Sequence, residues 1–256
     1  MILLIDIGNT SIVVGGTQRG KLLFRDRIPT HGEDLRCALS ALLDKNIAAP
    51  ERITGAALTS VVPEATEKIL NALKENGISD PFVINCRTDT GLTLKVDRPE
   101  TVGTDMIVGA AAAVHKYGAP LVLIDMGTAT TFSYIDPAFN YQGHIILPGI
   151  QVSLNALLEK TAQLPPVELE VPPHIIGKNT ADAMRSGMLF GSAAMVDGIL
   201  DRIMDSYALT QENVTIVATG GLSPIVIPLC SHRILVEEDL LLEGLYELYT
   251  RQRKAA

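Results

Sequence analysis

Two short apolar runs that each end in an Asp-x-Gly turn constrain the fold of this chain more than any other feature. The run MILLID leads into DIGNTS at Asp6–Ser11, and the run PLVLID leads into DMGTAT at Asp125–Thr130. A β-branched or aromatic run follows each turn, so each segment predicts a strand–turn–strand hairpin. Because the two copies stand nearly half the chain apart, the pattern indicates an internal duplication of two α/β halves.

Segments with helical spacing separate and follow these strands. Thr104 and Gly118 are the expected N-cap and stop of one helix, and the longest helix is expected to run from about Thr180 to Tyr207. Further helices are expected over 34–46, 63–77, 148–164 and 239–253. We expect two domains, residues 1–117 and residues 118–256, with a boundary near the 116–120 segment.

The two turns have the composition of an anion site. Gly8 and Gly127 permit backbone conformations that point successive N–H groups into a concavity, and Asn9, Thr10, Ser11, Thr128 and Thr130 would add donors. Neither turn is a P-loop or a dinucleotide-binding turn, because both of those feed a helix. A carboxylate beside phosphate is repelled unless a cation lies between them, so Asp6 and Asp125 suggest Mg²⁺ or another cation.

A plainer interpretation stays open for each turn taken alone. Asp and Gly form tight turns in many proteins, and Ser or Thr often caps a local backbone group. The repetition of the turn in both halves, together with a strand that ends in ATGG at 218–221, favours phosphate binding. The two glycines there would let the backbone approach a nucleotide base or ribose closely.

Charge, cysteine use and hydropathy exclude several classes of partner. The net charge is −8 with no basic run beyond RQRK at 251–254, which argues against a nucleic-acid partner. The three cysteines are widely spaced, which fits a reducing compartment, and the longest apolar stretch, 106–114, falls short of the ~20 residues of a membrane span. We therefore expect a soluble, cytoplasmic protein with no membrane or nucleic-acid partner.

In chain order, DIGNT, GTD, DMGTATT, PGI, GKNT and TGG resemble the motifs of bacterial type III pantothenate kinases, and the resemblance spans the chain. It implies an α/β fold of duplicated ribonuclease-H-like (actin-like ATPase) domains facing a cleft. It also implies ATP-dependent phosphorylation of pantothenate to 4′-phosphopantothenate, the first step of coenzyme A biosynthesis. The resemblance further implies a homodimer that requires Mg²⁺ and a monovalent cation, K⁺ or NH₄⁺.

The resemblance also assigns roles to individual residues. It implies that Asp105 is the catalytic base, that Asp6 positions Mg²⁺ through water, and that Asp125 ligates the monovalent cation. The residues implied in ATP binding are Asp6, Ile7, Gly8, Asn9, Thr10, Ser11, Ile12, Val13 and Thr128. Those implied in pantothenate binding are Gly103, Thr104, Asp105, Met106 and Thr180, the last of them across the dimer interface.

Two of these residues also have structural interpretations. Asp105 falls in the first turn of an expected helix, where the helix dipole favours its ionised form, but it could also serve only as a cap behind Thr104. Thr180 could be the N-cap of the long helix as well as a pantothenate ligand. Along that helix Gly187 and Gly191 lie on one face, which favours close packing within the chain or between subunits.

Met106 is the departure from the family pattern that matters most. The family segment usually reads Gly-Ala-Asp-Arg, whereas this chain reads Gly-Thr-Asp-Met at 103–106. Methionine offers neither charge nor donor, so loss of the arginine is expected to weaken activity unless another group, such as Arg98, replaces it. Met106 could instead pack beneath the helix. The functional hypotheses are thus an active pantothenate kinase, a nucleotide-binding relative with a regulatory role, or a kinase of another small hydroxylated substrate.

Overall fold

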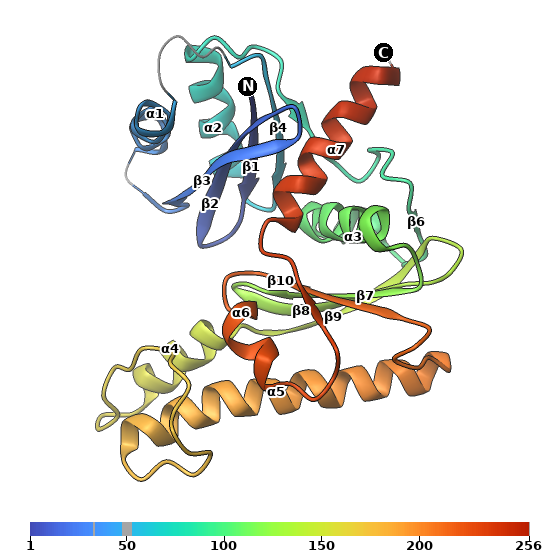
Figure 1. The fold of residues 1–256 in the computed structure, drawn as a ribbon. Coiled ribbons are helices and arrows are strands. Elements are labelled where there is room, and N and C mark those ends of the chain that lie inside the picture. Colours follow the sequence, from blue (N-terminus) through green and yellow to red (C-terminus); the bar gives the residue numbers. More distant parts are fainter. Residues whose placement is uncertain (33, 48–52, 256) are drawn as a thin grey trace. The chain divides into compact units, whose positions relative to one another are not determined.

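The computed structural model of the chain describes residues 1–32, 34–47 and 53–255 (Figure 1). The strands are β1 Ile2–Ile7, β2 Ser11–Gln18, β3 Lys21–Pro29, β4 Gly55–Ser60, β5 Phe82–Val83, β6 Thr93–Leu94, β7 Leu121–Met126, β8 Ala129–Ile135, β9 Asn140–Pro148, β10 Thr215–Thr219 and β11 Leu235–Val236. The α-helices are α1 Leu35–Asn46, α2 Pro63–Glu75, α3 Thr104–Tyr117, α4 Ile150–Lys160, α5 Thr180–Tyr207, α6 Ser223–Val226 and α7 Leu240–Ala255. Short 3₁₀ turns span Pro99–Thr101 and Ile227–Leu229.

The chain forms two compact units that interleave along the sequence. Unit 1 comprises residues 1–92, 96–115 and 239–256, and unit 2 comprises residues 93–95 and 116–238. The final helix α7 therefore belongs to unit 1, although unit 2 precedes it in the sequence. The expected division into domains 1–117 and 118–256 stays a prediction, from which these units differ chiefly in the placement of α7.

The sheet of unit 1 has the strand order β3-β2-β1-β4-β5. Strands β1 and β2 form an antiparallel hairpin, and β4 lies parallel to β1 on its other side. Side chains alternate between the two faces of β1, so Leu3, Ile5 and Ile7 pack against α1 and α2. Leu4 packs on the opposite face with residues of α3 and α7, which include Val108 and Leu245. Asp6 shares this second face with Leu4.

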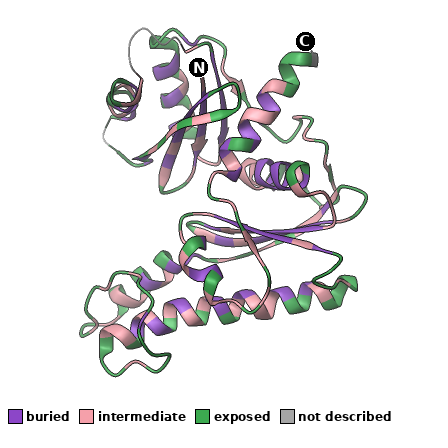
Figure 2. Ribbon diagram, viewed as in Figure 1, coloured by how far each residue is buried: buried purple, intermediate pink, exposed green. Residues whose placement is uncertain are grey.

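The sheet of unit 2 repeats this arrangement. Its strand order is β11-β10-β7-β8-β9-β6, with β7 and β8 antiparallel and β10 parallel to β7. The order β9-β8-β7-β10-β11 matches β3-β2-β1-β4-β5 position by position, as the repeated turns predicted. One face of this sheet packs against α5 through buried residues such as Leu189, Val196 and Leu200. In Figure 2 the buried residues follow the strands of each sheet and the inward sides of its helices.

The local predictions are confirmed with two corrections at helix starts. The two hairpins, the helix with Pro63 at its first position, and α5 over Thr180–Tyr207 all form as expected. Thr180 is not the N-cap of α5, because Asn179 is: its side chain accepts a hydrogen bond from the Asp182 amide at 2.8 Å. Thr104 is the first residue of α3, and its hydroxyl donates to the Ser60 carbonyl of β4 instead of capping its own helix.

In the ranges 1–32, 34–47 and 53–255, the helices are too short or too polar to cross a membrane.

Candidate functional site

The first hairpin closes on a tight turn whose tip is exposed. The Gly8 amide donates to the Ser11 carbonyl at 3.1 Å, and Asn9 and Thr10 lie exposed at the tip. The end of β3 supports the turn from outside, because the Thr30 hydroxyl donates to the Gly8 carbonyl at 2.6 Å. The Thr30 amide donates to the Thr10 carbonyl at 3.1 Å. The turn is thus held by backbone contacts that leave the polar side chains at its tip exposed.

Asp6 lies beside a buried threonine on the neighbouring strand. In the parallel pairing of β1 with β4, Asp6 is opposite Thr59, so both side chains leave the same face of the sheet. Thr59 is fully buried. The Thr59 hydroxyl donates to the Thr104 hydroxyl at 2.7 Å, and the Thr104 hydroxyl donates to the Ser60 carbonyl at 3.0 Å. These bonds bring the start of α3, and with it Asp105, to the edge of the sheet where Asp6 lies.

The Asp105 carboxylate is held in a restricted position at the first turn of α3. Its Oδ1 atom accepts a hydrogen bond from the Met106 amide at 2.8 Å. A Cβ atom on Gly103 would lie 2.4 Å from that same oxygen, so any larger residue at 103 would displace the carboxylate. Burial raises the pKa of Asp105 above its ordinary value, against the opposing effect of the backbone amides of Met106 and Asp105. Burial thus outweighs the two backbone amides that favour the ionised form.

Met106 and Arg98 do not supply a charge next to Asp105 in the described part of the chain. Met106 is partly buried at the start of α3. Arg98 pairs with Glu100, Nε to Oε1, at 3.2 Å, and 74% of its side chain is exposed. The suggestion that Arg98 replaces the family arginine finds no support in this pairing.

The second hairpin has the same plan with a shorter turn. Three residues, Gly127–Ala129, separate the paired Met126 and Thr130, whereas four, Gly8–Ser11, separate the paired Ile7 and Ile12. Thr128 is exposed at the tip, and its carbonyl accepts a hydrogen bond from the Gly149 amide at 3.0 Å.

Thr130 is not available as a donor at this turn. It is fully buried on the face of the sheet that carries Met126 and Phe132, and its hydroxyl has no hydrogen-bond partner among the described residues. The expectation that Thr130 would donate to a ligand at the turn is therefore wrong, because strand alternation turns its side chain into the core.

Asp125 lies at the end of β7 against the glycines that follow β10. Asp125 is opposite Thr219 in the parallel pairing, which repeats the pairing of Asp6 with Thr59. Gly220 has φ +90°, and a Cβ atom there would lie 2.7 Å from Asp125 Oδ1 and 2.6 Å from the carbonyl carbon of Met126. Gly220 is thus required by packing against Asp125, whereas no described atom comes within 4 Å of a Cβ at Gly221.

Thr180 stands apart from both hairpins in its local setting. It opens α5 as an exposed residue, after the segment 165–179 and next to the capping side chain of Asn179. The structure therefore brings Asp6 and Asp105 to one sheet edge in unit 1, and Asp125 and Thr128 to one hairpin in unit 2. Thr180 belongs to neither group.

The described residues contain no cluster of three or more His, Cys, Asp or Glu side chains that could hold a metal by themselves. This donor set still fits Mg²⁺ beside a phosphate-bearing ligand, since that ion keeps several waters and takes one or two carboxylates plus phosphate oxygens. Asp6 provides one such carboxylate. For a monovalent cation, Asp125 provides a carboxylate oxygen near the Met126 backbone, where a Cβ at Gly220 would come within 2.7 Å of that oxygen.

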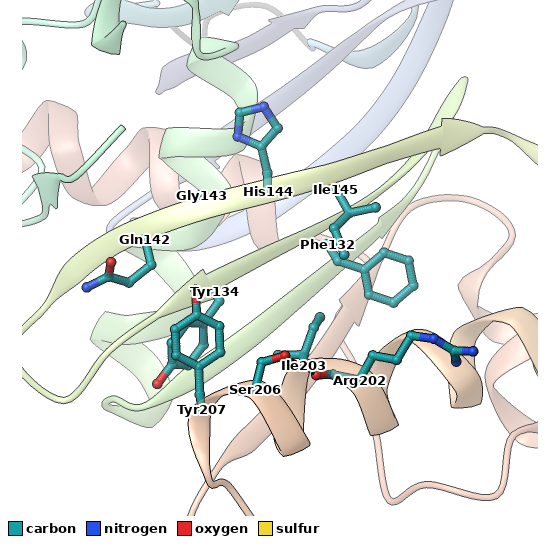
Figure 3. A pocket seen from close by; sticks show the side chains of 10 residues that line it. All are labelled: Phe132, Tyr134, Gln142, Gly143, His144, Ile145, Arg202, Ile203, Ser206 and Tyr207. Atoms are coloured by element: carbon teal, nitrogen blue, oxygen red, sulfur yellow. Dashed lines mark hydrogen bonds between the residues drawn. The ribbon is translucent and has the colours of Figure 1, made fainter. Parts of the chain in front are cut away.

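A cavity of about 380 Å³ in unit 2 lies elsewhere, between α5 and the β8–β9 pair. Phe132, Tyr134, Ile203 and Tyr207 line its apolar part, and the rings of Tyr134 and Tyr207 lie 4.2 Å apart (Figure 3). His144 projects to the other side of its strand. None of the residues predicted to bind ATP, metal or pantothenate lines this cavity.

Thr59, Thr30 and Thr219 are the residues of the candidate site that the sequence did not single out. Each bonds to or pairs with a segment far away in sequence, so their roles depend on strand pairings that local patterns do not specify. The one local signal was a polar residue at the end of an apolar strand, as in GAALTS and TIVAT.

Comparison with known proteins assigns the chain to a family of enzymes. A family model described as type III pantothenate kinase matches residues 2–202. A type III pantothenate kinase of Exiguobacterium sibiricum is 40% identical over 257 residues, which cover 99% of this chain and 100% of the relative. One from Exiguobacterium sp. AT1b is 38% identical over 258 residues, with the same coverage.

Solved structures of lower identity share the fold. A putative 2-dehydro-3-deoxygalactonokinase of Sinorhizobium meliloti aligns with a TM-score of 0.60 at 13% identity, over 98% of this chain and 96% of that one. Component A of the (R)-2-hydroxyglutaryl-CoA dehydratase of Acidaminococcus fermentans aligns with a TM-score of 0.58 at 14% identity, over 100% and 99%. The duplicated ribonuclease-H-like, actin-like ATPase fold class expected from the sequence is confirmed.

Proposed function

Because this chain belongs to the type III pantothenate kinase family, we propose that it transfers the γ-phosphoryl group of ATP to the hydroxyl group of pantothenate. The product is 4′-phosphopantothenate, and the reaction is the first step of coenzyme A biosynthesis. The full-length identity to relatives named for this activity supports both the enzyme class and the small-molecule substrate.

The observation that carries the chemistry is the position of Asp105. Phosphoryl transfer needs little covalent help from a protein, and depends mostly on orienting the nucleophile and neutralising charge. A carboxylate that accepts the proton of the attacking hydroxyl orients that hydroxyl at the same time. Asp105 accepts a hydrogen bond from the Met106 amide, occupies space left by the missing side chain of Gly103, and follows Thr104, which is anchored to β4, so its carboxylate is held in a restricted position. Its raised pKa makes it a better base than an ordinary aspartate.

ATP is assigned to the segments that expose donors at hairpin turns. The assigned residues are Asp6, Ile7, Gly8, Asn9, Thr10, Ser11, Ile12, Val13 and Thr128. In this assignment the exposed hydroxyls and the remaining amides at the turns donate to phosphate oxygens, because the Gly8 and Gly127 amides donate within their own turns. Ile7 and Ile12 fix the strand ends that hold the first turn. Thr30 rigidifies the first turn through its bond to Gly8.

The cations are part of the proposal. Mg²⁺, when bound, would supply positive charge that offsets the charge of the phosphates. Asp6 would hold it through water, and Asp125 would ligate a monovalent cation, K⁺ or NH₄⁺, beside Gly220. Without these cations the two carboxylates would repel ATP, which explains why acidic residues are tolerated at these turns.

Pantothenate is assigned to Gly103, Thr104, Asp105, Met106 and Thr180. The described contacts refine these roles. Gly103 leaves space for the Asp105 carboxylate. The Thr104 hydroxyl accepts a hydrogen bond from Thr59 and donates one to the Ser60 carbonyl, so its proton is used within the protein. Thr180 is exposed at the start of α5 and would reach pantothenate across a homodimer interface. We place the enzyme in the cytoplasm, where its cysteines Cys37, Cys86 and Cys230 remain free thiols.

A coupled assay with ATP, Mg²⁺, K⁺ and pantothenate tests the proposal. We expect turnover, and we expect Asp105→Asn to lower kcat by about 10²- to 10⁴-fold while ATP affinity changes little. Loss of ATP binding in this variant would mean that the base is misplaced. No turnover by the wild-type chain, with ATP still bound, would favour the nucleotide-binding regulatory relative instead.

Met106→Arg separates the remaining alternatives. If methionine impairs an otherwise complete pantothenate site, restoring the family arginine raises turnover of pantothenate. If the chain instead acts on another small hydroxylated substrate, Met106→Arg leaves pantothenate turnover low, and a panel of hydroxylated acids with the wild-type chain identifies the substrate.

A further inference from the structure

Thr59 begins a chain of two hydrogen bonds, from Thr59 to Thr104 to the Ser60 carbonyl, which we call the relay. None of the roles assigned above includes Thr59. Its side chain is fully buried, and its hydroxyl donates to Thr104 Oγ1 at 2.7 Å. Thr104 Oγ1 in turn donates to the Ser60 carbonyl at 3.0 Å. Because each hydroxyl has one proton, both protons are used inside the protein, and neither is left to donate to a ligand.

This relay anchors the first turn of α3 to the end of β4. The Thr104 hydroxyl does not cap its own helix. It bonds instead to Ser60 and Thr59 of β4, which lie 44 and 45 residues earlier in the chain. Asp105 follows Thr104 directly and turns back to accept from the Met106 amide. A shift of Thr104 away from β4 therefore moves the Asp105 carboxylate by a similar amount.

The position of Thr59 also links this anchor to the other carboxylate of unit 1. Thr59 is opposite Asp6 in the parallel pairing, so one buried residue adjoins the strand that carries Asp6 and bonds to the residue that precedes Asp105. An error of about 1 Å in the position of a reacting group can cost about 10²-fold in rate. Through these two contacts, Thr59 helps to set the distance between the Asp6 and Asp105 carboxylates.

We propose that Thr59 is a positioning residue for phosphoryl transfer. It acts through Thr104 to hold the Asp105 carboxylate at a fixed distance from Asp6, near the C-terminal end of β1. This inference rests on the proposed function, because it takes Asp105 as the base. Thr59 is buried and touches no substrate in this assignment, so its loss lowers kcat and leaves the KM for ATP nearly unchanged.

The test compares Thr59→Val, which removes the hydroxyl at almost constant shape, with Thr59→Ser, which retains it. We expect Thr59→Val to lower kcat at least about tenfold, with the KM for ATP within about twofold, and Thr59→Ser to restore most of the rate. The matched control is Thr17→Val. Thr17 is also a buried threonine in unit 1, and its hydroxyl donates to the Lys21 carbonyl at 3.0 Å, at the far end of β2. Thr17→Val is expected to lose comparable thermal stability and to keep its kcat.

A second readout does not depend on turnover. Hydrogen exchange at the Met106 amide, which donates to Asp105 Oδ1, reports the order of this turn directly. We expect faster exchange at Met106 in Thr59→Val and not in Thr17→Val. The double variant Thr59→Val/Thr104→Val should be no slower in turnover than the worse of the two single variants, because both remove one relay.

The inference is overturned if Thr59→Val keeps wild-type kcat and Met106 protection, or if Thr17→Val loses as much activity. Should Thr59→Val fail to fold, Thr104→Val tests the same relay and must reproduce the loss of kcat. Failure of the proposed function looks different: the wild-type chain would not phosphorylate pantothenate, while the exchange at Met106 would still decide whether Thr59 orders this turn.

Discussion

Gly103 shows how a single missing methyl group can set the geometry of the carboxylate that we propose as the catalytic base. A Cβ atom there would lie 2.4 Å from Asp105 Oδ1, and the atom it displaces is the end of a side chain that can move. We therefore expect Gly103→Ala to displace the carboxylate and lower kcat about tenfold or more, with little loss of stability. Steady-state kinetics and thermal unfolding measure the two effects.

Gly187→Ala is the matched control for that variant, because no described atom lies within 4 Å of the added Cβ. It should leave kcat unchanged. A Gly103→Ala enzyme with wild-type kcat would show that the carboxylate tolerates the methyl group, and the proposed restriction of Asp105 would be wrong.

The burial of Asp105 predicts a dependence of stability on pH. Its folded-state pKa lies above the unfolded value of about 3.9, so the unfolded state loses its proton first as pH rises. This residue therefore destabilises the fold progressively as pH rises from the unfolded pKa to the folded pKa, and the full cost persists above it. Asp105→Asn removes the cost, so it should raise the urea midpoint at pH 7 and have little effect below the unfolded pKa. A less stable Asp105→Asn variant at pH 7 contradicts the sign of this shift.

At the scale of single elements, the start of α5 places a helix-capping residue, Asn179, next to Thr180, which we propose as a pantothenate ligand. Asn179 caps the helix by accepting from the Asp182 amide, and its amide group donates to Asp182 Oδ2 at 2.8 Å. Asn179→Ala should lower the free energy of unfolding by about 1 kcal/mol, and Asn179→Ser should retain most of it. Thr180→Ala should leave stability unchanged and raise the KM for pantothenate. Equal stability losses in both alanine variants would assign the cap to Thr180 as well.

The elements also show what local sequence could predict. The two hairpins were predictable because strand alternation and Asp-x-Gly turns are local signals, and the α5 bounds because its helical pattern is long and uninterrupted. The cap of α5 was misassigned by one residue, since Asn and Thr are both good N-cap residues and stand side by side. The Thr59–Thr104 relay could not be predicted, because it depends on the pairing of β1 with β4, whose paired residues lie 53 positions apart in sequence, and on the placement of α3.

At the scale of the whole molecule, α7 completes unit 1 from the end of the sequence. A Cβ atom on Gly244 would lie 2.9 Å from Ala112 Cβ and 2.9 Å from the Val108 carbonyl, so α7 and α3 pack at close range. Gly244→Ala should destabilise the protein by about 1–3 kcal/mol through overpacking, although alanine is the better helix former by about 1 kcal/mol. Hydrogen exchange should rise in β1 and β4, which α7 covers, more than in β7.

Gly191→Ala provides the comparison for that variant. It lies in a helix of unit 2, and no described atom comes within 4 Å of its added Cβ, so it should stabilise by up to about 1 kcal/mol. If both variants stabilise the protein, the close packing of α7 on α3 does not limit stability. The amphipathic pattern of α7 predicted a helix from sequence, but not the unit to which it belongs.

The return of α7 also sets the order in which a ribosome can complete this enzyme. The strands of unit 1 are synthesised first, yet Leu4 on β1 is covered by Leu245 and Tyr249, which are synthesised after all of unit 2. A nascent chain can therefore finish the sheet of unit 2 while unit 1 still exposes an apolar face. A chain that stopped before α7 would contain both hairpins and Asp105. Its unit 1 sheet would still expose an apolar face, which is the kind of surface that chaperones bind. Unit 1 therefore covers this apolar face only after translation has passed through α7.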